Sequence, residues 1–358
     1  MKIKVLHMIH SLVGGGAEKQ LRLLANGMNT EIFDVTVFCV NDAGHDIDSQ
    51  SVNITVANEK SPYKLSYLRE IWRVIRDNKP DIVHIWLPAS VSIPAMLFAF
   101  IQGRKIIFSY RNRMTFNRGL CYPEFLIALI CADTIISNHE VIDSNFLYKW
   151  LYKLKHGRVI RNAVYVPDNY QKTSLAKVAT NKFIFIGRLT KQKNPLILID
   201  AFAALKGRAG WCLEVYGKGE LEGAINNLIA IHGLNDKIFM KGFTPDPYLV
   251  MQAADCLIFP SLHEGMPNVL VEAFNIGLPV IASNITENIN LVNDNESVIW
   301  VNPCEVQSIS NGVTSFLAMD VESRQKLVIN AKKISSEYAI EKMVLSYQYF
   351  YKSMSEKL

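Results

Sequence analysis

Cysteine and histidine patterns that hold a metal ion or build a disulfide framework are missing from this chain of 358 residues. The six cysteines are scattered, and none of them forms a Cys-x-x-Cys pair. The histidines are also spread out, without two on one helix at the spacing of metal ligands. Isolated cysteines inside apolar runs are typical of reduced thiols in cytoplasmic proteins. We therefore expect no disulfides, no protein-bound metal and no other cofactor.

Long apolar runs are missing as well. The longest candidate, residues 91–101, contains Pro94 and falls short of the roughly 18 residues that a membrane span requires. The first residues predict a short strand broken by glycines, which is not the pattern of a signal peptide. These absences favour a cytoplasmic protein, bound to a membrane only peripherally if it meets one.

Several motifs of nucleotide binding and hydrolysis are absent too. The chain has no Gly-x-Ser-x-Gly elbow and no Gly-x-x-x-x-Gly-Lys-Ser/Thr loop, which argues against a serine hydrolase and a P-loop NTPase. Gly14, Gly15 and Gly16 follow the first predicted strand without the Gly-x-Gly-x-x-Gly spacing of a dinucleotide site. A plain tight turn and a backbone approach to a phosphate or sugar both explain these glycines. No nucleic-acid-binding module is recognisable, so no nucleic-acid partner is expected.

The chain does contain an alternation of apolar strands and helices, and the alternation occurs twice. The expected strands of the first half are residues 2–9, 35–40, 81–86, 105–110 and 132–137. Those of the second half are residues 183–186, 211–216, 238–240, 256–259 and 280–282. Strands that are apolar on both faces and alternate with helices are typical of doubly wound parallel sheets. We expect an α/β fold with two Rossmann-like domains that face a central cleft.

Two carboxylates mark the most informative stretch. Glu264 lies in a Gly/Pro loop after a predicted strand, and Glu272 follows after seven intervening residues, in the second turn of a predicted helix. Helix N-termini bind phosphate through free N–H groups and a favourable dipole. Carboxylates accept hydrogen bonds from neighbouring hydroxyls. A phosphate next to a diol is the chemistry of a nucleotide-sugar.

A loop that contains Arg188 and Lys193 follows the first strand of the second half. Arg188 and Lys193 lie on either side of this loop, which opens onto a helix at Pro195. Two cations at a helix entrance suit a diphosphate, although a solvated basic turn gives the same pattern. Gly217 and Gly242 lie where the next two strands end, and their accessible backbone suits a base or a ribose.

Positive charge gathers in the first half of the chain. The net charge is +5, and residues 1–165 carry +6, with 20 Lys and Arg against 14 Asp and Glu. Trp150 lies in an apolar stripe close to Lys149, Lys153 and Lys155. A basic amphipathic helix with a tryptophan is typical of helices that lie on an anionic membrane surface. A core-facing helix with a solvated basic face explains the same pattern, so both interpretations stand.

With these residues assembled, the chain resembles the retaining glycosyltransferases of family 4, which have the GT-B architecture. The resemblance covers nearly the full length and is strongest over residues 183–282. Its most specific motif is Glu-x7-Glu, present here as Glu264 and Glu272. The other matching blocks are Gly187-Arg188-Leu189 with Lys193-Asn194-Pro195, Gly15-Gly16-Ala17-Glu18, and Arg161-Asn162-Ala163-Val164.

The resemblance implies a site for a nucleoside-diphosphate sugar, expected to be a UDP-sugar, that works without a metal. Arg188 and Lys193 would hold the diphosphate. Glu272 would bind the ribose, and Glu264 would bind the donor sugar. The other donor-binding residues would be Gly15, Gly16, Gly187, Gly217, Gly242, Phe243, Gly265, Met266, Pro267, Asn268, Val269 and Leu270. The family needs no enzyme nucleophile, because it stabilises the leaving group and permits front-face attack.

The resemblance also implies an order of domains. Residues 1–165 would bind the acceptor, residues 166–182 would be the linker, and residues 183–339 would bind the donor. Residues 340–358 would form a helix that packs back on the first domain. One departure is Arg111, which stands where many members carry a histidine that contacts the donor sugar. The surrounding Ser-x-Arg-Asn resembles members that build bacterial surface polysaccharides, so Arg111 is expected to be catalytic together with Glu264, Arg188 and Lys193.

We therefore expect a retaining hexosyltransferase on the inner face of the cell membrane. Its acceptor would be a lipid-linked oligosaccharide or lipopolysaccharide in cell-surface polysaccharide synthesis. One alternative is a GT-B-type sugar-nucleotide epimerase, which would release nucleotide and sugar without an acceptor. Another is an inactive subunit that binds a nucleotide-sugar. The presence of both glutamates and both cations disfavours the inactive subunit.

Overall fold

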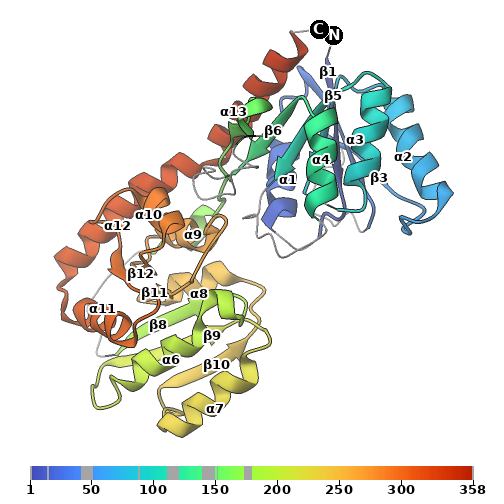
Figure 1. The fold of residues 1–358 in the computed structure, drawn as a ribbon. Coiled ribbons are helices and arrows are strands. Elements are labelled where there is room, and N and C mark those ends of the chain that lie inside the picture. The colour runs from blue at the N-terminus through green and yellow to red at the C-terminus, as the bar shows by residue number, and fades with distance from the viewer. Residues whose placement is uncertain are drawn as a thin grey trace. The chain divides into compact units, whose positions relative to one another are not determined.

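A computed structural model of the protein describes residues 2–13, 16–41, 51–87, 89–110, 121–138, 150, 152–172 and 180–356. The chain folds into two compact units, each built around its own parallel sheet (Figure 1). The first unit comprises Met1–Ala163 and Ile340–Leu358, and the second comprises Val164–Ala339. The chain therefore leaves the first unit and returns to it at its end.

The sheet of the first unit has seven parallel strands in the order β3-β2-β1-β4-β5-β6-β7. The strands are β1 (Ile3–Ile9), β2 (Phe33–Cys39), β3 (Asn53–Val56), β4 (Ile82–Trp86), β5 (Lys105–Tyr110), β6 (Thr134–Ser137) and β7 (Arg158–Val159). The register places Val5 of β1 between Val35 of β2 and Ile82 of β4. Rows of apolar side chains therefore cross the central strands, as expected for a sheet that is covered on both faces.

Helices cover both faces of this sheet. The helices α2 (Leu65–Asn78), α3 (Ser92–Ile101) and α4 (Cys121–Cys131) pack on one face, whereas α1 (Gly16–Gly27) and α13 (Ile340–Ser355) pack on the other. In α2, Tyr67, Ile71 and Ile75 recur every four residues and are fully buried. This spacing gives the helix one apolar face toward the sheet and one polar face toward solvent.

The second unit has a six-stranded parallel sheet in the order β10-β9-β8-β11-β12-β13. Its strands are β8 (Asn181–Ile186), β9 (Trp211–Tyr216), β10 (Ile238–Gly242), β11 (Cys256–Phe259), β12 (Val280–Ser283) and β13 (Ile299–Val301). Its helices are α6 (Pro195–Ala203), α7 (Glu222–His232), α8 (Pro247–Ala253), α9 (Asn268–Ile276), α10 (Thr286–Val292), α11 (Val306–Ala318) and α12 (Val321–Ser335). Two separate hydrophobic cores lie in this unit, one with α6, α7 and α11 and one with α8, α9 and α12.

The predicted fold class, two doubly wound parallel α/β sheets, is confirmed. The strands β3, β7 and β13 and the helices α3, α4 and α10 were not predicted. All three strands lie at sheet edges, and most of their residues are exposed or only half buried. An edge strand needs few apolar residues, so it leaves little signal in the hydrophobic pattern.

The segment expected to begin the linker packs on the second unit where the structure describes it. Val164 and Val166 are buried in one of that unit's cores. The Tyr170 hydroxyl donates a hydrogen bond of 2.7 Å to the Asp246 carboxylate. The stretch 164–172 therefore belongs structurally to the second unit, and residues 173–179 lie outside the described residues.

Candidate functional site

The strand order of the second unit reverses beside β8. The chain runs from β8 outward to β9 and β10, and then crosses to β11 on the other side of β8. Parallel sheets bind ligands beyond the carboxyl ends of the strands at such a switch point, because the helices that follow the two strands pack on opposite faces of the sheet. The loop of residues 187–194 follows β8, and the loop of residues 260–267 follows β11. Arg188, Lys193 and Glu264, all predicted from sequence, lie on these two loops.

Hydrogen bonds join the two loops directly. The backbone N–H of Leu262 donates to the Gln192 carbonyl at 2.9 Å. The side-chain amide of Gln192 donates back to the His263 carbonyl, also at 2.9 Å. The side-chain amide of Asn194 donates to the carbonyls of Pro260 and Pro303. These contacts fix the position of the loop after β8 against the loop after β11.

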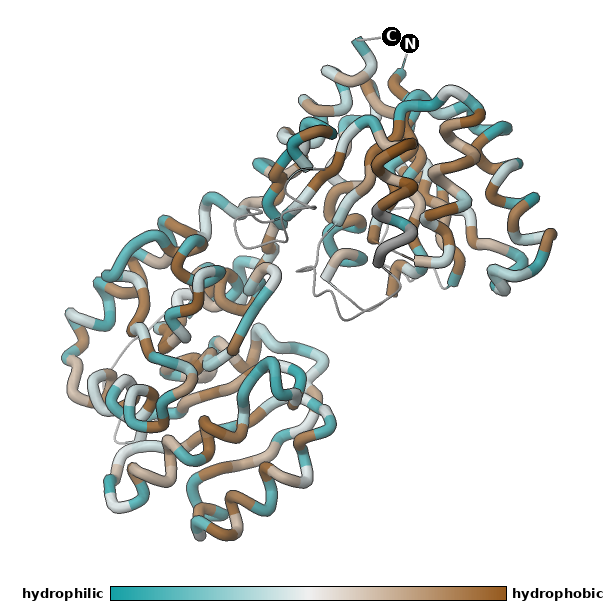
Figure 2. The backbone as a smooth tube through the Cα atoms, in the orientation of Figure 1, coloured by the Kyte–Doolittle hydropathy of each residue, from teal (hydrophilic) through white to brown (hydrophobic). Residues whose placement is uncertain are grey.

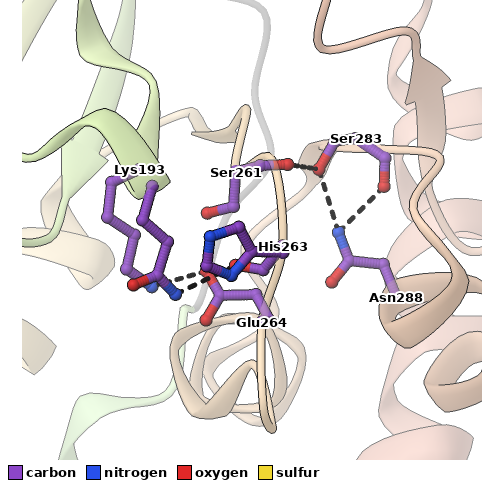
Figure 3. Close-up of polar contacts among 7 residues, drawn as sticks. Lys193, Ser261, His263, Glu264, Ser283 and Asn288 are labelled. Carbon is purple, nitrogen blue, oxygen red and sulfur yellow. Dashed lines mark hydrogen bonds and ion pairs between the residues drawn. The ribbon is translucent and has the colours of Figure 1, made fainter. Parts of the chain in front are cut away.

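Lys193 and Glu264 form an ion pair across the two loops. The distance from Nζ of Lys193 to Oε1 of Glu264 is 2.6 Å, and only 14% and 6% of the two side chains are exposed (Figure 3). The Lys193 ammonium also lies 5.1 Å from the centre of the Phe259 ring, where a cation–π attraction adds to the pair. The structure therefore brings together two residues that are 71 positions apart in sequence.

The turn before α6 explains how Lys193 reaches this position. Residues Lys191–Lys193 form one turn of 3-10 helix, and Asn194 follows in the left-handed region with φ 58° and ψ 41°. Asparagine tolerates this conformation better than most residues. Pro195 then begins α6, and its fixed φ and missing N–H suit the first position of a helix. The sequence Lys-Asn-Pro thus turns the chain sharply just after the cation.

Arg188 differs from Lys193 in its surroundings. The residue is exposed, and its guanidinium has no hydrogen bond or ion pair with any residue that the structure describes. Because the charge of Lys193 is balanced by Glu264, Arg188 leaves a net positive charge at the switch point. An arginine in this state can bind a phosphate through two parallel N–H groups.

Glu272 lies on α9, the helix that follows the Glu264 loop. The residue belongs to the second turn and is buried, with 8% of its surface exposed. The hydroxyl of Tyr248 lies 3.4 Å from Oε1 of Glu272 and donates a shorter bond of 3.0 Å to the Tyr165 carbonyl. The predicted residues Asn268, Val269 and Leu270 form the first turn of the same helix. The Glu264 loop and this helix end therefore belong to one continuous segment.

Gly217 has a steric reason to be glycine. Its φ is 142°, and a Cβ atom there would lie 1.8 Å from the carbonyl oxygen of Gly187. Its N–H donates to the Gly242 carbonyl at 2.8 Å, and the N–H of Gly187 donates to the Tyr216 carbonyl at 3.0 Å. The backbone ladder of β8, β9 and β10 thus continues through three predicted glycines. Phe243 follows directly, with 70% of its surface exposed.

A buried polar chain supports the Glu264 loop, and sequence reasoning missed it. The side-chain amide of Asn288 donates to the carbonyl and hydroxyl oxygens of Ser283 at 2.8 and 3.2 Å, and the Ser283 hydroxyl donates to the Ser261 carbonyl at 2.7 Å (Figure 3). All three residues are fully buried. Within the described residues, the Ser261 hydroxyl itself has no hydrogen-bond partner. The local sequence does not mark Asn288 out, because its role follows from its burial beside Ser283.

Tyr216 ends β9 next to these loops and remains protonated over the physiological range. Burial and a 2.8 Å hydrogen bond to the Glu214 carboxylate raise the pKa of Tyr216 to about 12. Across the described residues, no cluster of three or more metal-binding side chains occurs. None of the described helices is both long and apolar enough to span a membrane.

Comparison with known families identifies the family to which this chain belongs. Residues 14–166 match the family described as glycosyltransferase family 4, and residues 168–334 match glycosyl transferases group 1. Together the two matches span residues 14–334 apart from residue 167. The chain belongs to the family-4 glycosyltransferases. The loops that carry Arg188, Lys193 and Glu264 lie wholly inside the second match.

Relatives of this glycosyltransferase include an uncharacterised protein and two proteins that are named for an activity. An uncharacterised glycosyltransferase of Methanocaldococcus jannaschii is 31% identical over 265 residues, and this match spans 64% of each chain, slightly less than two thirds. A Campylobacter jejuni N-acetylgalactosaminyltransferase that acts on a diphospho-undecaprenol substrate is 26% identical over 87% of this chain and 89% of its own. An Escherichia coli α-1,3-galactosyltransferase, named for UDP-Gal and α-D-GlcNAc-diphosphoundecaprenol, is 25% identical over 87% of each chain.

Solved structures share the fold of this glycosyltransferase. A glycosyltransferase of Rickettsia africae superposes with a TM-score of 0.78 at 19% identity, over 99% of this chain and 98% of that chain. The Anabaena HepE protein, solved in complex with UDP and glucose, superposes with a TM-score of 0.77 at 19% identity, over 98% and 100%. At these identities the likeness shows the fold alone, and it confirms the predicted GT-B fold.

Three of the predicted residues are not among those that the structure describes. Gly15, Arg111 and Lys149 lie outside the described residues. Gly16 is described, and it begins α1 directly after the loop that follows β1. The roles predicted for these residues stay predictions.

Proposed function

We propose that this glycosyltransferase moves a sugar from a nucleoside-diphosphate sugar, expected to be a UDP-sugar, to a lipid-linked oligosaccharide or lipopolysaccharide. The transfer retains the anomeric configuration and needs no metal. The observation that carries the proposal is the Lys193–Glu264 pair beside Arg188 at the switch point of the second unit. This arrangement offers one carboxylate to a polyhydroxylated group and two cations to a diphosphate within a single site.

Each residue has a distinct role in this proposal. The Lys193 ammonium has three N–H donors, so it can keep its bond to Glu264 and still donate to phosphate oxygens. Glu264 orients that ammonium and accepts hydrogen bonds from sugar hydroxyls through its second oxygen. Arg188 binds the diphosphate, and Glu272 accepts hydrogen bonds from the ribose hydroxyls.

The two cations also support the chemical step. As the bond between sugar and phosphate breaks, negative charge grows on the departing nucleoside diphosphate. Arg188 and Lys193 stabilise that charge more in the transition state than in the ground state, which lowers the barrier. The acceptor hydroxyl then attacks from the face that the diphosphate leaves, so no enzyme nucleophile is required. Proton transfer from the acceptor goes to a phosphate oxygen of the leaving group.

The acceptor is proposed from the relatives. Two of them are named for undecaprenyl-diphosphate-linked substrates, which lie in a membrane. We therefore propose that this chain works on the cytoplasmic face of the cell membrane, bound peripherally through cations such as Lys149, Lys153 and Lys155. The sugar, the nucleotide base and the linkage are open to direct measurement.

Nucleotide binding tests the donor site. Thermal stabilisation of the purified protein by UDP, GDP, ADP and CMP, without added metal, should be selective for one nucleotide. Glu272→Ala and Arg188→Ala should each weaken its binding by roughly 1.5–3 kcal/mol, because each removes a charge-assisted interaction. Arg208→Ala is the matched control, since Arg208 is exposed in the loop that precedes β9, at the opposite ends of the strands from the two loops. Unchanged affinity in both site variants would remove the proposed roles.

Product analysis tests the reaction. With a UDP-sugar and a diphosphate-linked acceptor in EDTA, the anomeric proton of the product should report the same configuration as the donor. An inverted product would contradict retention, and a rate abolished by EDTA would contradict metal independence. Release of free sugar and nucleotide without acceptor would instead identify an epimerase-type enzyme.

A further inference from the structure

One face of the first unit exposes apolar side chains that no other part of the described chain covers. On α3, Leu97, Phe100 and Ile101 are 36%, 53% and 65% exposed. On α4, Leu126 and Ile130 are 45% and 64% exposed. Residues three and four positions apart share one side of a helix. Each helix therefore presents an apolar stripe to the outside, and we call these five residues the apolar face.

The two stripes belong to neighbouring helices without exposed charge. α3 and α4 pack against each other on the same face of the sheet (Figure 1), and both are mostly brown, the colour of hydrophobic residues, in Figure 2. α3 contains no charged residue, and the single charge of α4, Glu124, is buried. Helices at the surface of a globular unit normally carry charged residues on their outer side. Grouped exposed apolar residues mark a site of interaction.

Cations line one side of the apolar face. Arg69, Arg73 and Arg76 recur at helical spacing and form an exposed row on α2. α2 is fixed beside α3 by the contact of Trp72 with Phe98, whose rings meet edge to face at 5.3 Å. We call the three arginines the arginine row.

Little acidic charge opposes this row. Arg76 pairs with Asp77 at 2.7 Å, but Arg69 and Arg73 make no hydrogen bond or ion pair with the described residues. The nearest other carboxylate on α2, Glu70, accepts hydrogen bonds from Asn58. Two guanidinium groups beside the apolar face are therefore available to an anionic partner.

The other side of the apolar face carries a second basic and apolar segment. Tyr152 packs against the same core as α2, α3 and α4, so it lies on the same side of the sheet as these helices. Trp150 and Leu154 are about half exposed, and Lys153 between them is exposed. This segment overlaps the basic stripe predicted from sequence. The apolar centre is thus flanked by cations on both sides.

We propose that the outer face of α2, α3 and α4 docks on an anionic lipid bilayer. The apolar face enters the interface between headgroups and acyl chains, and the arginine row meets the anionic headgroups. A second copy of the chain fits less well, because a symmetric pair would present the same arginines to this surface instead of carboxylates. The proposal deepens the membrane association proposed above by assigning it to named residues. It does not depend on sugar transfer.

Vesicle binding of the full-length protein tests this surface. The probe is flotation with phosphatidylcholine vesicles, with and without phosphatidylglycerol. The double variant Ile101→Asp/Ile130→Asp should lose binding to anionic vesicles. The matched control is Ile231→Asp/Ile329→Asp, since both isoleucines are exposed on helices of the second unit. The control should bind as the wild type does.

The arginine row has its own prediction. Arg69→Gln/Arg73→Gln should lower partitioning onto anionic vesicles roughly thirtyfold at low salt, since each cation near an anionic surface contributes about 1 kcal/mol. Binding of this variant should rise less steeply with the phosphatidylglycerol content than binding of the wild type does.

Three results would overturn the proposal. The first is absence of wild-type binding to anionic vesicles. The second is equal binding by wild type and Ile101→Asp/Ile130→Asp. The third is a wild-type dimer in sedimentation velocity that the apolar-face variant converts to monomer without any vesicle binding, which would assign the surface to a second copy. Each result would leave the donor-site measurements unchanged, so the two proposals fail separately.

Discussion

At the scale of single residues, the Lys193–Glu264 pair connects stability with the proposed function. Both charges are largely withdrawn from water, so each depends on the other for compensation. A buried ion pair is strongly destabilised when one partner is removed, whereas replacing both partners by neutral groups is far milder. A substitution here therefore affects folding as well as donor binding, and the two effects can be separated.

Lys193→Met should destabilise the second unit by about 3 kcal/mol, because it leaves the Glu264 carboxylate buried without its cation. The double variant Lys193→Met/Glu264→Gln should regain most of that stability and should still lack activity. Chemical denaturation followed by circular dichroism measures the first effect, and a transfer assay measures the second. Equal destabilisation in the single and double variants would show that the two charges do not compensate each other.

At the scale of elements, the structure shows how the ends of different strands are held together. The buried chain from Asn288 to Ser283 to Ser261 ties α10 and β12 to the loop that carries Glu264. Side chains that are placed by such bonds stay within the narrow range that a binding site requires. The geometry of this loop therefore depends on residues that would not touch the ligand at the proposed donor site.

Asn288→Ala should destabilise the protein by about 1–3 kcal/mol, because the buried carbonyl of Ser283 loses its donor. We also expect kcat to fall more than nucleotide affinity, since the Glu264 loop loses support. Asn227→Ala is the control, because Asn227 is exposed on α7 and should change stability by no more than about 0.5 kcal/mol. Wild-type stability and turnover in Asn288→Ala would show that the polar chain is dispensable.

At the scale of the whole molecule, the end of the chain completes the first unit. α13 supplies Tyr347 and Tyr351, both fully buried among residues of β1, β4 and α1. The hydroxyl of Tyr351 lies 2.7 Å from Nδ1 of His84, whose Nε2 lies 2.6 Å from the Ser109 hydroxyl. The core of the first unit therefore closes only when the last helix docks.

Tyr351→Ala should destabilise the first unit by about 4 kcal/mol, because it opens a cavity and removes a buried hydrogen bond. Tyr349 lies on the same helix with 77% of its surface exposed, so Tyr349→Ala should be neutral within about 0.5 kcal/mol. Unfolding curves in denaturant compare the two variants. Nucleotide binding by the second unit should survive in both under native conditions. An equal effect of the two substitutions would show that α13 does not contribute to the core.

Much of this architecture could be predicted from sequence for a physical reason. Central parallel strands are covered on both faces, so they must be apolar throughout, and that requirement appears as short runs such as residues 105–110 and 256–259. Edge strands carry no such requirement, and three of them, β3, β7 and β13, were missed. The glycosyltransferase family could be predicted because its motifs are local. Glu264 and Glu272 form one short motif and the Arg188 loop forms another, so both can be recognised without knowing which residues touch in the structure.

The sequence by itself thus determined the two sheets, the family and the residues that the donor site is proposed to use. Only the tertiary structure decided that Lys193 touches Glu264, that Asn288 supports their loop and that α3 and α4 leave an apolar face beside the arginine row. The reason is the range of the interactions. Strand and helix patterns depend on neighbours a few positions away, whereas an ion pair across 71 residues or an uncovered helix face depends on how distant elements pack.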